Sequence, residues 1–281
     1  MKNKKPTDIN VFYKILMYSF LILGVIITLF PFYYMLVGAT HVGSEVLSFP
    51  PKLTFGSNLM NNINTLIVEY KLPKILFNSL FISTTYMILT LILCSFAGYA
   101  FSKYNFKFKG LIFSMLMLTM MIPQQALLVP LFNLMNTIGW SDSYAAVIVP
   151  GLSNAFGIFL MKQNMDTVSN ELIESGRIDG CGEMGIFFKI VLPVVKPSLG
   201  ALAIYMFMQS WGSFLWPLVI LGSQDMMTIP VVLSSMSQVM GAVDYGAIMA
   251  LSTISVIPLA TVFLFMQKQF VAGMTAGAVK G

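Results

Sequence analysis

Charged residues are scarce in this chain. Asp, Glu, Lys and Arg make up 10% of its 281 residues, whereas 57% are hydrophobic. A soluble domain carries about 25% charged residues, so this composition excludes an ordinary soluble domain and indicates a protein that lies in a lipid bilayer. The sequence pI of about 9.1 is compatible with nucleic-acid binding, but the basic residues form no single long patch. We therefore expect no nucleic-acid partner.

Histidine and cysteine are also rare. The chain has one histidine, His41, and two cysteines, Cys94 and Cys181. Cys94 lies in an apolar run and Cys181 in a polar segment, so we expect no disulfide between them. With one histidine there is no plausible His/Cys metal cluster, and we expect His41 to be an ordinary residue at a helix end.

The chain lacks the patterns of several enzymes and transporters. It has no G-x-x-x-x-G-K-[ST] loop, so it should not hydrolyse ATP alone. Paired acids, a histidine cluster and a nucleophile–base arrangement are also missing, so we expect no catalytic residue and no cofactor bound by this chain. An ion-coupled secondary transporter generally uses ionisable groups inside the membrane. The apolar runs have none in their cores, but backbone carbonyls can bind sodium, so that alternative stays open.

Six long stretches separate the charged residues, and each can cross a bilayer, which takes about 20 residues. They predict helices near residues 15–37, 76–100, 111–135, 143–162, 199–221 and 247–268. The fourth is the shortest and contains Pro150 and Gly151. The first follows a basic segment, as in a signal peptide, but its apolar run exceeds the 7–15 residues of a signal core. The predicted fold class is an all-α membrane protein with six transmembrane helices.

The basic residues predict the orientation of these helices. If the segments between helices are assigned to alternate sides, thirteen of the sixteen Lys and Arg residues lie on one side, and only Lys52, Lys71 and Lys74 on the other. Positive residues favour the cytoplasm, so both termini are expected there. The predicted segments are a cytoplasmic N-terminus at 1–14, a first helix at 15–37, an extracytoplasmic segment at 38–75, a five-helix core at 76–268 with a cytoplasmic loop at 163–198, and a cytoplasmic tail at 269–281. Residues 40–74 read equally as a structured cap or a plain connector.

The cytoplasmic loop has the pattern of a helix, a turn and a second helix. Glu171 and Glu174 suit the first turn of a helix, and Gly180 and Gly182 permit a sharp turn. Four apolar residues then recur at helical spacing and predict one apolar face: Met184, Phe187, Phe188 and Val191. Two prolines, Pro193 and Pro197, are expected to end the second helix. An ordinary amphipathic loop would share much of this pattern.

The spacing within this loop resembles the EAA loop of ABC-importer permeases. The matching residues are Glu174-Ser175-Gly176, Ile178-Asp179-Gly180 and Ile190-x-Leu192-Pro193, with Ser175 and Gly176 in place of the usual alanines. The resemblance implies the ABC-importer permease fold, and a pair of short cytoplasmic helices that docks into a groove on an ATP-hydrolysing subunit. The candidate coupling residues are Glu171, Glu174, Ser175, Gly176, Asp179, Gly180, Ile190, Leu192 and Pro193.

Further motifs resemble the carbohydrate-uptake branch of these permeases, the maltose-permease G-subunit type. They are Pro123-x-x-Ala126-Leu127-x-x-Pro130-Leu131-Phe132, residues 214–218 (FLWPL) and residues 267–270 (QKQF) before a tail of small residues. This resemblance implies a bacterial plasma (inner) membrane protein that works by alternating access. It implies as partners a second homologous permease, two ATP-binding-cassette subunits that hold ATP and Mg, and an extracytoplasmic solute-binding protein that delivers a sugar or oligosaccharide. A permease for a non-sugar solute is the alternative within the family.

Polar and aromatic residues inside the spans are candidates for the solute pathway. They are Gln124, Asn154, Gln209, Trp211 and Trp216. Polar side chains within a membrane usually face protein or a cavity, and a tryptophan can stack on a sugar ring. The competing interpretations are a proline-kinked helix at Pro123, whose amides satisfy nearby backbone, and tryptophans that only anchor the interface. The sequence does not name the sugar, nor the subunit that carries most of its contacts.

Overall fold

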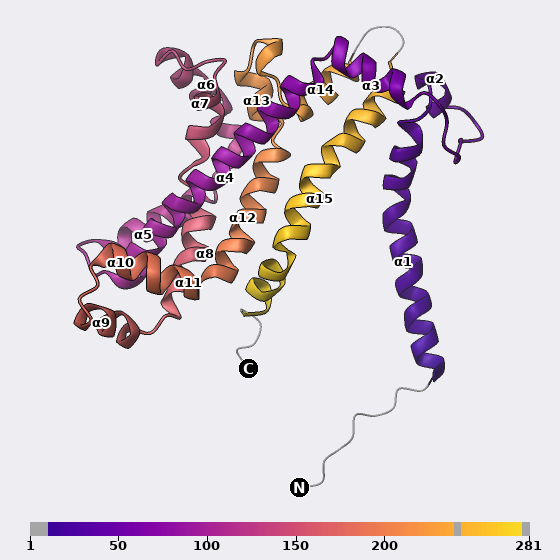
Figure 1. Cartoon of the computed structure of the whole chain (residues 1–281). Coiled ribbons are helices and arrows are strands. Elements are labelled where there is room, and N and C mark those ends of the chain that lie inside the picture. Colours follow the sequence, from indigo (N-terminus) through magenta and orange to yellow (C-terminus); the bar gives the residue numbers. More distant parts are fainter. Residues whose placement is uncertain (1–10, 239–242, 277–281) are drawn as a thin grey trace. The chain divides into compact units, whose positions relative to one another are not determined.

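The computed structural model describes residues 11–238 and 243–276, with side chains described as far as Gln267. Every regular element in these residues is helical. Four of the basic residues that predict the orientation lie outside the described residues: Lys2, Lys4, Lys5 and Lys280. The contacts divide the chain into two compact units, Met1–Glu69 with Met236–Ser255, and Tyr70–Ser235 with Val256–Gly281. Figure 1 labels the helices.

The first unit contains α1 (Val11–Gly38), α2 (Gly43–Val46), α3 (Leu59–Val68) and the first turns of α15 (Tyr245–Ala276). Along α1 the apolar side chains are exposed, and burial begins only at Val37. Gly38 lies so close to Met249 of α15 that a Cβ there would be 3.0 Å from its Cγ. A long helix with apolar side chains on all sides is expected where the surroundings are lipid.

Within the first unit, residues 40–69 are structured and contain α2 and α3, which favours the structured cap over a plain connector. The buried Asn62 of α3 donates to the carbonyls of Ala39 (2.8 Å) and His41 (2.9 Å). Both ring nitrogens of His41 are engaged, Nδ1 with Glu45 and Nε2 with the carbonyl of Thr54, each at 2.8 Å. The asparagine-rich stretch therefore folds back onto the end of α1.

The core of the second unit is formed by α4 (Leu72–Lys103), α8 (Ala155–Asp166) and α12 (Lys196–Trp211). Glycines allow α4 and α8 to approach closely. A Cβ on Gly98 would lie 2.7 Å from Met161 Cβ, and one on Gly157 would lie 2.7 Å from Cys94 Sγ. Small residues at helix contacts are typical of membrane bundles, where tight packing replaces the hydrophobic effect between helices.

The described residues contain up to six candidate spans, which agrees with the predicted all-α membrane fold, but only three of them are continuous helices. In the described residues α1, α4 and α15 (as far as Gln267) are long and apolar enough to cross a membrane. Three bent pairs pass the same test together: Lys109–Thr119 with Gln124–Thr137 (93°), Tyr144–Gly151 with Ala155–Asp166 (46°), and Glu183–Val194 with Lys196–Trp211 (81°). The first pair consists of α5 (Lys109–Thr119), η1 (Gln124–Leu127) and α6 (Leu128–Thr137), and the second of α7 (Tyr144–Ile148), η2 (Val149–Gly151) and α8.

Proline explains where two predicted helices differ from the observed ones. The helix predicted at 111–135 breaks before Pro123, which is extended (ψ 130°) and has no N–H to continue the helix. The helix predicted at 199–221 ends at Trp211, and α13 (Leu215–Ile220) follows after Gly212. Pro217 lies in this short helix, where its missing N–H prevents one continuous span. Two further elements, η4 (Gln224–Met226) and α14 (Ile229–Met236), precede α15.

The fourth and sixth spans also differ from prediction. The break in the fourth falls between Gly151 and Ala155, after Pro150, and α8 then continues to Asp166, past the predicted end at 162. The last helix, α15, continues to Ala276, although a tail was expected from 269. Its interior proline, Pro258, lies well before that end, and no proline follows it to stop the helix.

Candidate functional site

The first helix of the loop is α9 (Asn170–Ile178). Ser169 caps it, because its side chain accepts a hydrogen bond from the N–H of Leu172 (3.3 Å). Glu171 lies in the first turn, where negative charge is favourable. Its pKa is lowered by hydrogen bonds from its own backbone N–H and from Ser169. Ile173 and Gly176 are buried, whereas Glu174 and Ser175 are exposed, so α9 is amphipathic.

A tight turn joins α9 to the second helix, as the two glycines predicted. Gly180 has φ +80°, in the left-handed region, which a residue with a Cβ occupies only with strain. The N–H of Cys181 donates to the carbonyl of Gly176 (2.9 Å), and that of Gly180 to Arg177 (3.0 Å). The turn therefore depends on the conformational freedom of Gly180. Gly182 has φ −69° and does not need to be glycine for this reason.

The second helix runs from Glu183 to Val194 as α10 (Glu183–Ile186), the π-helical η3 (Phe187–Val191) and α11 (Leu192–Val194). The prediction of one apolar face is wrong. Phe187 and Val191 are buried, but Met184 is 61% exposed and Phe188 is 53% exposed. A π turn widens the helix, so residues spaced for an α-helical face lie on two sides of it.

Of the two prolines predicted to end the second helix, only Pro193 lies at its end. Pro193 is exposed and lies inside the last turn, one residue before the helix ends at Val194. Pro197 is at the other side of the break, in the first turn of α12. A first turn tolerates proline because its N–H groups have no partner within the helix.

The structure brings two of the motif residues, Gly176 and Ile190, into contact. A Cβ on Gly176 would lie 2.5 Å from Ile190 Cδ1. The small residue at position 176 thus allows α9 to pack on η3 within this chain. Leu192 is half-buried, while Asp179 and Gly180 are exposed on the turn.

A three-residue polar cluster, which sequence reasoning missed, ties the loop together. Arg177 of α9 donates through Nε to Glu183 Oε1 (2.7 Å) and through Nη2 to Oε2 (3.2 Å). The Tyr104 hydroxyl, directly after α4, donates to the same carboxylate. Arg177, and then Tyr104, lower the pKa of Glu183. The opposite charges on either side of the glycine turn were the available signal for the first pair, but nothing in the sequence pointed to Tyr104.

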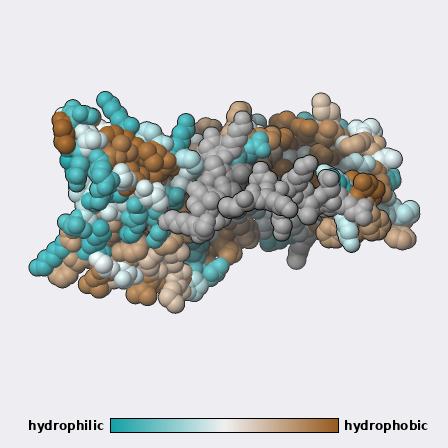
Figure 2. Space-filling view, turned by 90° about the horizontal axis from the view of Figure 1, so that it is seen from below, coloured by the Kyte–Doolittle hydropathy of each residue, from teal (hydrophilic) through white to brown (hydrophobic). Residues whose placement is uncertain are grey.

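The exposed side of the loop combines apolar and charged residues. Ile178 is 86% exposed, and Met184 and Phe188 of the same loop are also exposed. Glu174 and Asp179 are exposed on the same loop. In Figure 2 hydrophilic side chains gather at the left-hand end of the view, with apolar ones among them. Large exposed apolar side chains outside a membrane are typical of a protein-binding surface.

Of the five candidate pathway residues, Asn154 and Trp216 are hydrogen-bonded within this chain and Gln124 is exposed. Asn154 caps α8, because its side chain accepts from the N–H of Gly157 (2.9 Å). Trp216 donates through Nε1 to the carbonyl of Ala146 (2.9 Å), which holds α13 against α7. Gln124 is exposed at the start of η1, in the 93° break.

The other two candidates, Gln209 and Trp211, lie two residues apart at the end of α12. Trp211 is 5% exposed and stacks on Phe207, with ring centroids 5.6 Å apart. The side chain of Gln209 is half-buried, and its Oε1 is buried without a hydrogen-bond partner in this chain. An orphaned carbonyl oxygen at that depth is costly, so Gln209 is the candidate whose polar group most needs a further partner.

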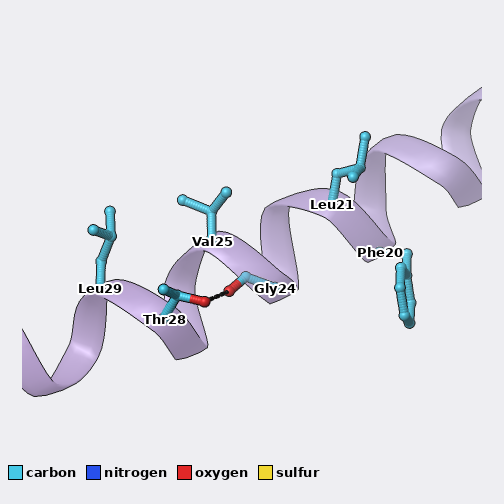
Figure 3. Close-up of a pocket in the computed structure, with 6 residues that line it drawn as sticks. All are labelled: Phe20, Leu21, Gly24, Val25, Thr28 and Leu29. Atoms are coloured by element: carbon cyan, nitrogen blue, oxygen red, sulfur yellow. Dashed lines mark hydrogen bonds between the residues drawn. The ribbon is translucent and has the colours of Figure 1, made fainter. Parts of the chain in front are cut away.

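A shallow apolar notch lies on α1. Figure 3 shows Leu21, Val25 and Leu29 projecting on one side of the helix and Phe20 on the other, with Gly24 and Thr28 between them. The Thr28 hydroxyl donates to the carbonyl of Gly24 (2.8 Å), so its polar atom is satisfied within the helix. The notch suits a lipid chain or another apolar helix and offers a polar solute nothing to bind.

These features define a multi-pass helical membrane protein with broken candidate spans and a helix–turn–helix at residues 170–194. The described residues contain no cluster of His, Cys, Asp or Glu that could hold a metal ion. The family described as binding-protein-dependent transport system inner membrane component matches residues 91–276, which include this loop. The chain belongs to that family, and is therefore the membrane subunit of a binding-protein-dependent transporter.

Similar proteins cover nearly the whole chain. It is 35% identical to the lactose transport system permease protein LacG of Rhizobium radiobacter, over 95% of this chain and 96% of that protein. It is 34% identical to the arabinooligosaccharides transport system permease protein AraQ of Bacillus subtilis, over 96% of each. The sn-glycerol-3-phosphate transport system permease protein UgpE of Yersinia enterocolitica is 31% identical, over 90% of this chain and 93% of that protein.

A solved structure has the same fold. The crystal structure of a bacterial ABC transporter involved in the import of the acidic polysaccharide alginate matches with a TM-score of 0.81. The match covers 95% of this chain and all of that one, at 19% sequence identity. It confirms the ABC-importer permease fold.

Proposed function

We propose that this chain is the permease subunit of an ATP-driven importer for a neutral sugar or oligosaccharide. The loop of α9, the Gly180 turn and the second helix carries the proposal, because it exposes apolar residues where a membrane protein meets water. The sugar class is supported by the two transport proteins for lactose and arabinooligosaccharides that are similar over nearly their full length.

In this proposal the loop is the docking site of an ATP-hydrolysing subunit. Ile178, Met184 and Phe188 supply the apolar contact, and Glu174 meets a basic group on the partner by a charge-assisted hydrogen bond. The proposed assembly contains a second permease, two ATP-binding subunits and an extracytoplasmic binding protein. ATP and Mg bind to the partner subunits.

The solute pathway is proposed to pass Gln209. Its Oε1 has no hydrogen-bond donor within this chain. In the proposed pathway it accepts a hydrogen bond from a sugar hydroxyl. Gln124, in the exposed break between α5 and α6, is a second polar lining residue. Trp211 is packed on Phe207 and contributes at most the edge of its ring.

A phosphorylated solute is the second candidate, because the glycerol-3-phosphate permease is also similar. Binding of a phosphate usually involves Arg or Lys. In α1, α4, α5, α8 and α12 every lysine lies near a helix end: Lys14, Lys74, Lys103, Lys109, Lys162 and Lys196. This distribution favours a neutral solute.

Uptake by the assembled transporter tests the proposal. The chain should be expressed with its partner subunits in vesicles and offered labelled neutral oligosaccharides and labelled glycerol-3-phosphate, with and without ATP. ATP-dependent uptake of an oligosaccharide is expected. Uptake of glycerol-3-phosphate alone would contradict the sugar assignment, and ATP-independent uptake would contradict the importer.

Two glycine variants test the loop. Gly180→Ala places a Cβ at φ +80°, which costs on the order of 1–2 kcal/mol and changes the angle between the two helices. Gly182→Ala is the matched control, because its φ of −69° suits alanine and its Cβ would meet no atom within 4 Å. We expect reduced uptake and reduced co-purification of the ATPase subunit for the first variant only. If Gly180→Ala shows normal uptake and normal co-purification of the ATPase subunit, the loop is not the docking site.

A further inference from the structure

We propose that α4 is a rigid rod that carries motion of the coupling loop to a segment at its far end, residues 222–229, here called the strap. The inference rests on the proposed function, in which the loop follows an ATPase subunit. It assigns positioning roles to Tyr104 at one end of α4 and to Asn78 at the other.

The helix itself is suited to transmit movement. It has 32 residues, which at a rise of about 1.5 Å per residue gives a length of about 48 Å. Its only proline, Pro73, lies in the first turn. Of the long helices in the described residues, α1 contains Pro31 and α15 contains Pro258, and the other three spans are broken. Prolines and breaks are where helices bend, so α4 is the stiffest connection along the second unit (Figure 1).

Aromatic packing joins the loop to the C-terminal turns of α4. Phe187, which is 2% exposed, stacks on Phe96 with ring centroids 4.6 Å apart and lies 5.2 Å from the Tyr99 ring. The Tyr104 hydroxyl adds its hydrogen bond to Glu183, and Glu183 is held by Arg177. Both helices of the loop are thereby tied to α4.

Polar contacts join the same end of α4 to the start of the loop. Lys103 donates to the carbonyl of Val168 and to Asn170 Oδ1 (3.3 Å). Ser102 donates to Asp166 at the end of α8 (2.8 Å). The entry into α9 therefore follows the last turn of α4.

At the far end, the strap is held by a fully buried asparagine. Asn78, with 0% exposure, donates to the carbonyls of Asp225 (2.8 Å) and Met227 (2.9 Å) and accepts from the Tyr144 hydroxyl (2.7 Å). The next residue, Ser79, accepts from the N–H of Ile229 (2.9 Å). Buried polar groups that have all their partners are costly to separate, so the strap moves with α4.

Two surface contacts complete the attachment of the strap. Lys71 forms an ion pair with Asp225 (2.7 Å). Asp142, between α6 and α7, accepts from the N–H groups of Gly222 (3.0 Å) and Ser223 (3.1 Å). Residues from both ends of the strap are thus bonded to neighbouring elements, which excludes a freely hinged lid.

A distance measurement across the rod tests the proposal. Spin labels are placed at Lys189→Cys in the loop and Gln224→Cys in the strap, both exposed, in a Cys181→Ser background. The complex with its ATPase subunits is measured without nucleotide and with trapped ATP. A second label pair across the ATPase dimer shows that ATP has closed it. The distance between the loop and the strap is expected to stay the same in both states.

Tyr104→Phe is the informative variant, because it removes one oxygen from the joint between α4 and the loop. With ATP, the distribution of loop–strap distances in this variant is expected to broaden or shift, while co-purification of the ATPase stays normal. Tyr205→Phe removes the same atom from an exposed ring on α12 and should behave like the unsubstituted chain.

Two results would contradict the proposal that α4 acts as a rigid rod. The first is an ATP-dependent change of the loop–strap distance in the unsubstituted complex. The second is a Tyr104→Phe variant whose distance distribution with ATP equals that of the unsubstituted complex. Failure of the proposed function looks different, because no ATPase subunit would then co-purify with the unsubstituted chain.

Discussion

At the scale of single residues, the chain places its few polar groups with precision. Within the second unit, Asn78 uses three hydrogen bonds to satisfy a buried amide. Gln209 on α12 has a buried oxygen without a partner. An amide that is satisfied within the chain holds the fold together. An amide that is not satisfied marks a place where a solute or another subunit can bind.

Gln209→Leu tests this difference. The substitution removes an orphaned oxygen and keeps an apolar side chain of similar size, so membrane expression and ATPase co-purification should stay normal. Uptake of the transported sugar should fall, with a higher KM, because a hydrogen bond to the solute is lost. Trp211→Ala is a poor alternative, since truncation of a buried tryptophan costs about 3–5 kcal/mol and lowers expression by itself. Unchanged uptake kinetics for Gln209→Leu would place the solute contacts elsewhere.

At the scale of elements, the loop formed by α9, the Gly180 turn and the second helix is held in shape by contacts among its own helices. Gly176 packs against Ile190, and Arg177 reaches across the Gly180 turn to Glu183. The pair is about half exposed, at 45% and 48%. Exposed pairs contribute little to global stability, so we expect this pair to set the angle between the helices without deciding whether the protein folds.

Charge reversal tests the role of this pair. Arg177→Glu and Glu183→Arg should each lower uptake, because like charges then face each other across the turn. The double variant restores opposite charges and should recover much of the activity. Expression should be similar in all three. If the double variant is no better than the single ones, the pair does not set the helix angle.

The pH dependence follows from the lowered pKa of Glu183. A depressed carboxyl pKa stabilises the folded form above the ordinary value of about 4.3, and this contribution is lost as pH falls through the folded pKa. Between pH 8 and pH 6 the pair stays charged, so the advantage of the double variant over the single ones should not change in that range. Uptake by each variant relative to the unsubstituted protein, measured across this range, checks it.

At the scale of the whole molecule, the proposed topology has both termini and the coupling loop in the cytoplasm. The Lys and Arg distribution of thirteen to three supports it. Ser57 and Lys189 are both exposed, and they lie in segments predicted to be on opposite sides of the membrane.

Cysteines introduced one at a time at these positions test the topology in a Cys181→Ser background, in which the remaining Cys94 is buried. A membrane-impermeant thiol reagent should label Ser57→Cys in spheroplasts and Lys189→Cys only in inverted vesicles. Lys189 is preferable to Ser169, because Ser169 caps α9. Labelling of both cysteines from the same side would refute the six-span orientation.

The contacts around the site were harder to predict than the elements that carry them. The turn at Gly180 was predictable because it depends on local backbone angles, which glycine alone adopts freely. The burial of Phe187 and the exposure of Phe188 were not, because a π turn changed the helical period and because Phe96 and Tyr99 come from a distant helix. The bond from Tyr104 to Glu183 joins residues 79 positions apart, and no spacing rule connects them.

The sequence alone therefore determined that this is an all-α membrane protein with several spans, predicted as six, and where its loop turns. Those properties follow from local hydrophobicity, charge and backbone freedom, which each segment carries with it. Only the tertiary structure decided that α4 is continuous while its neighbours break, that Asn78 is satisfied and Gln209 is not, and which apolar residues of the loop remain exposed. These properties depend on which side chains from distant segments meet, and in a close-packed interior that is settled by the fold as a whole.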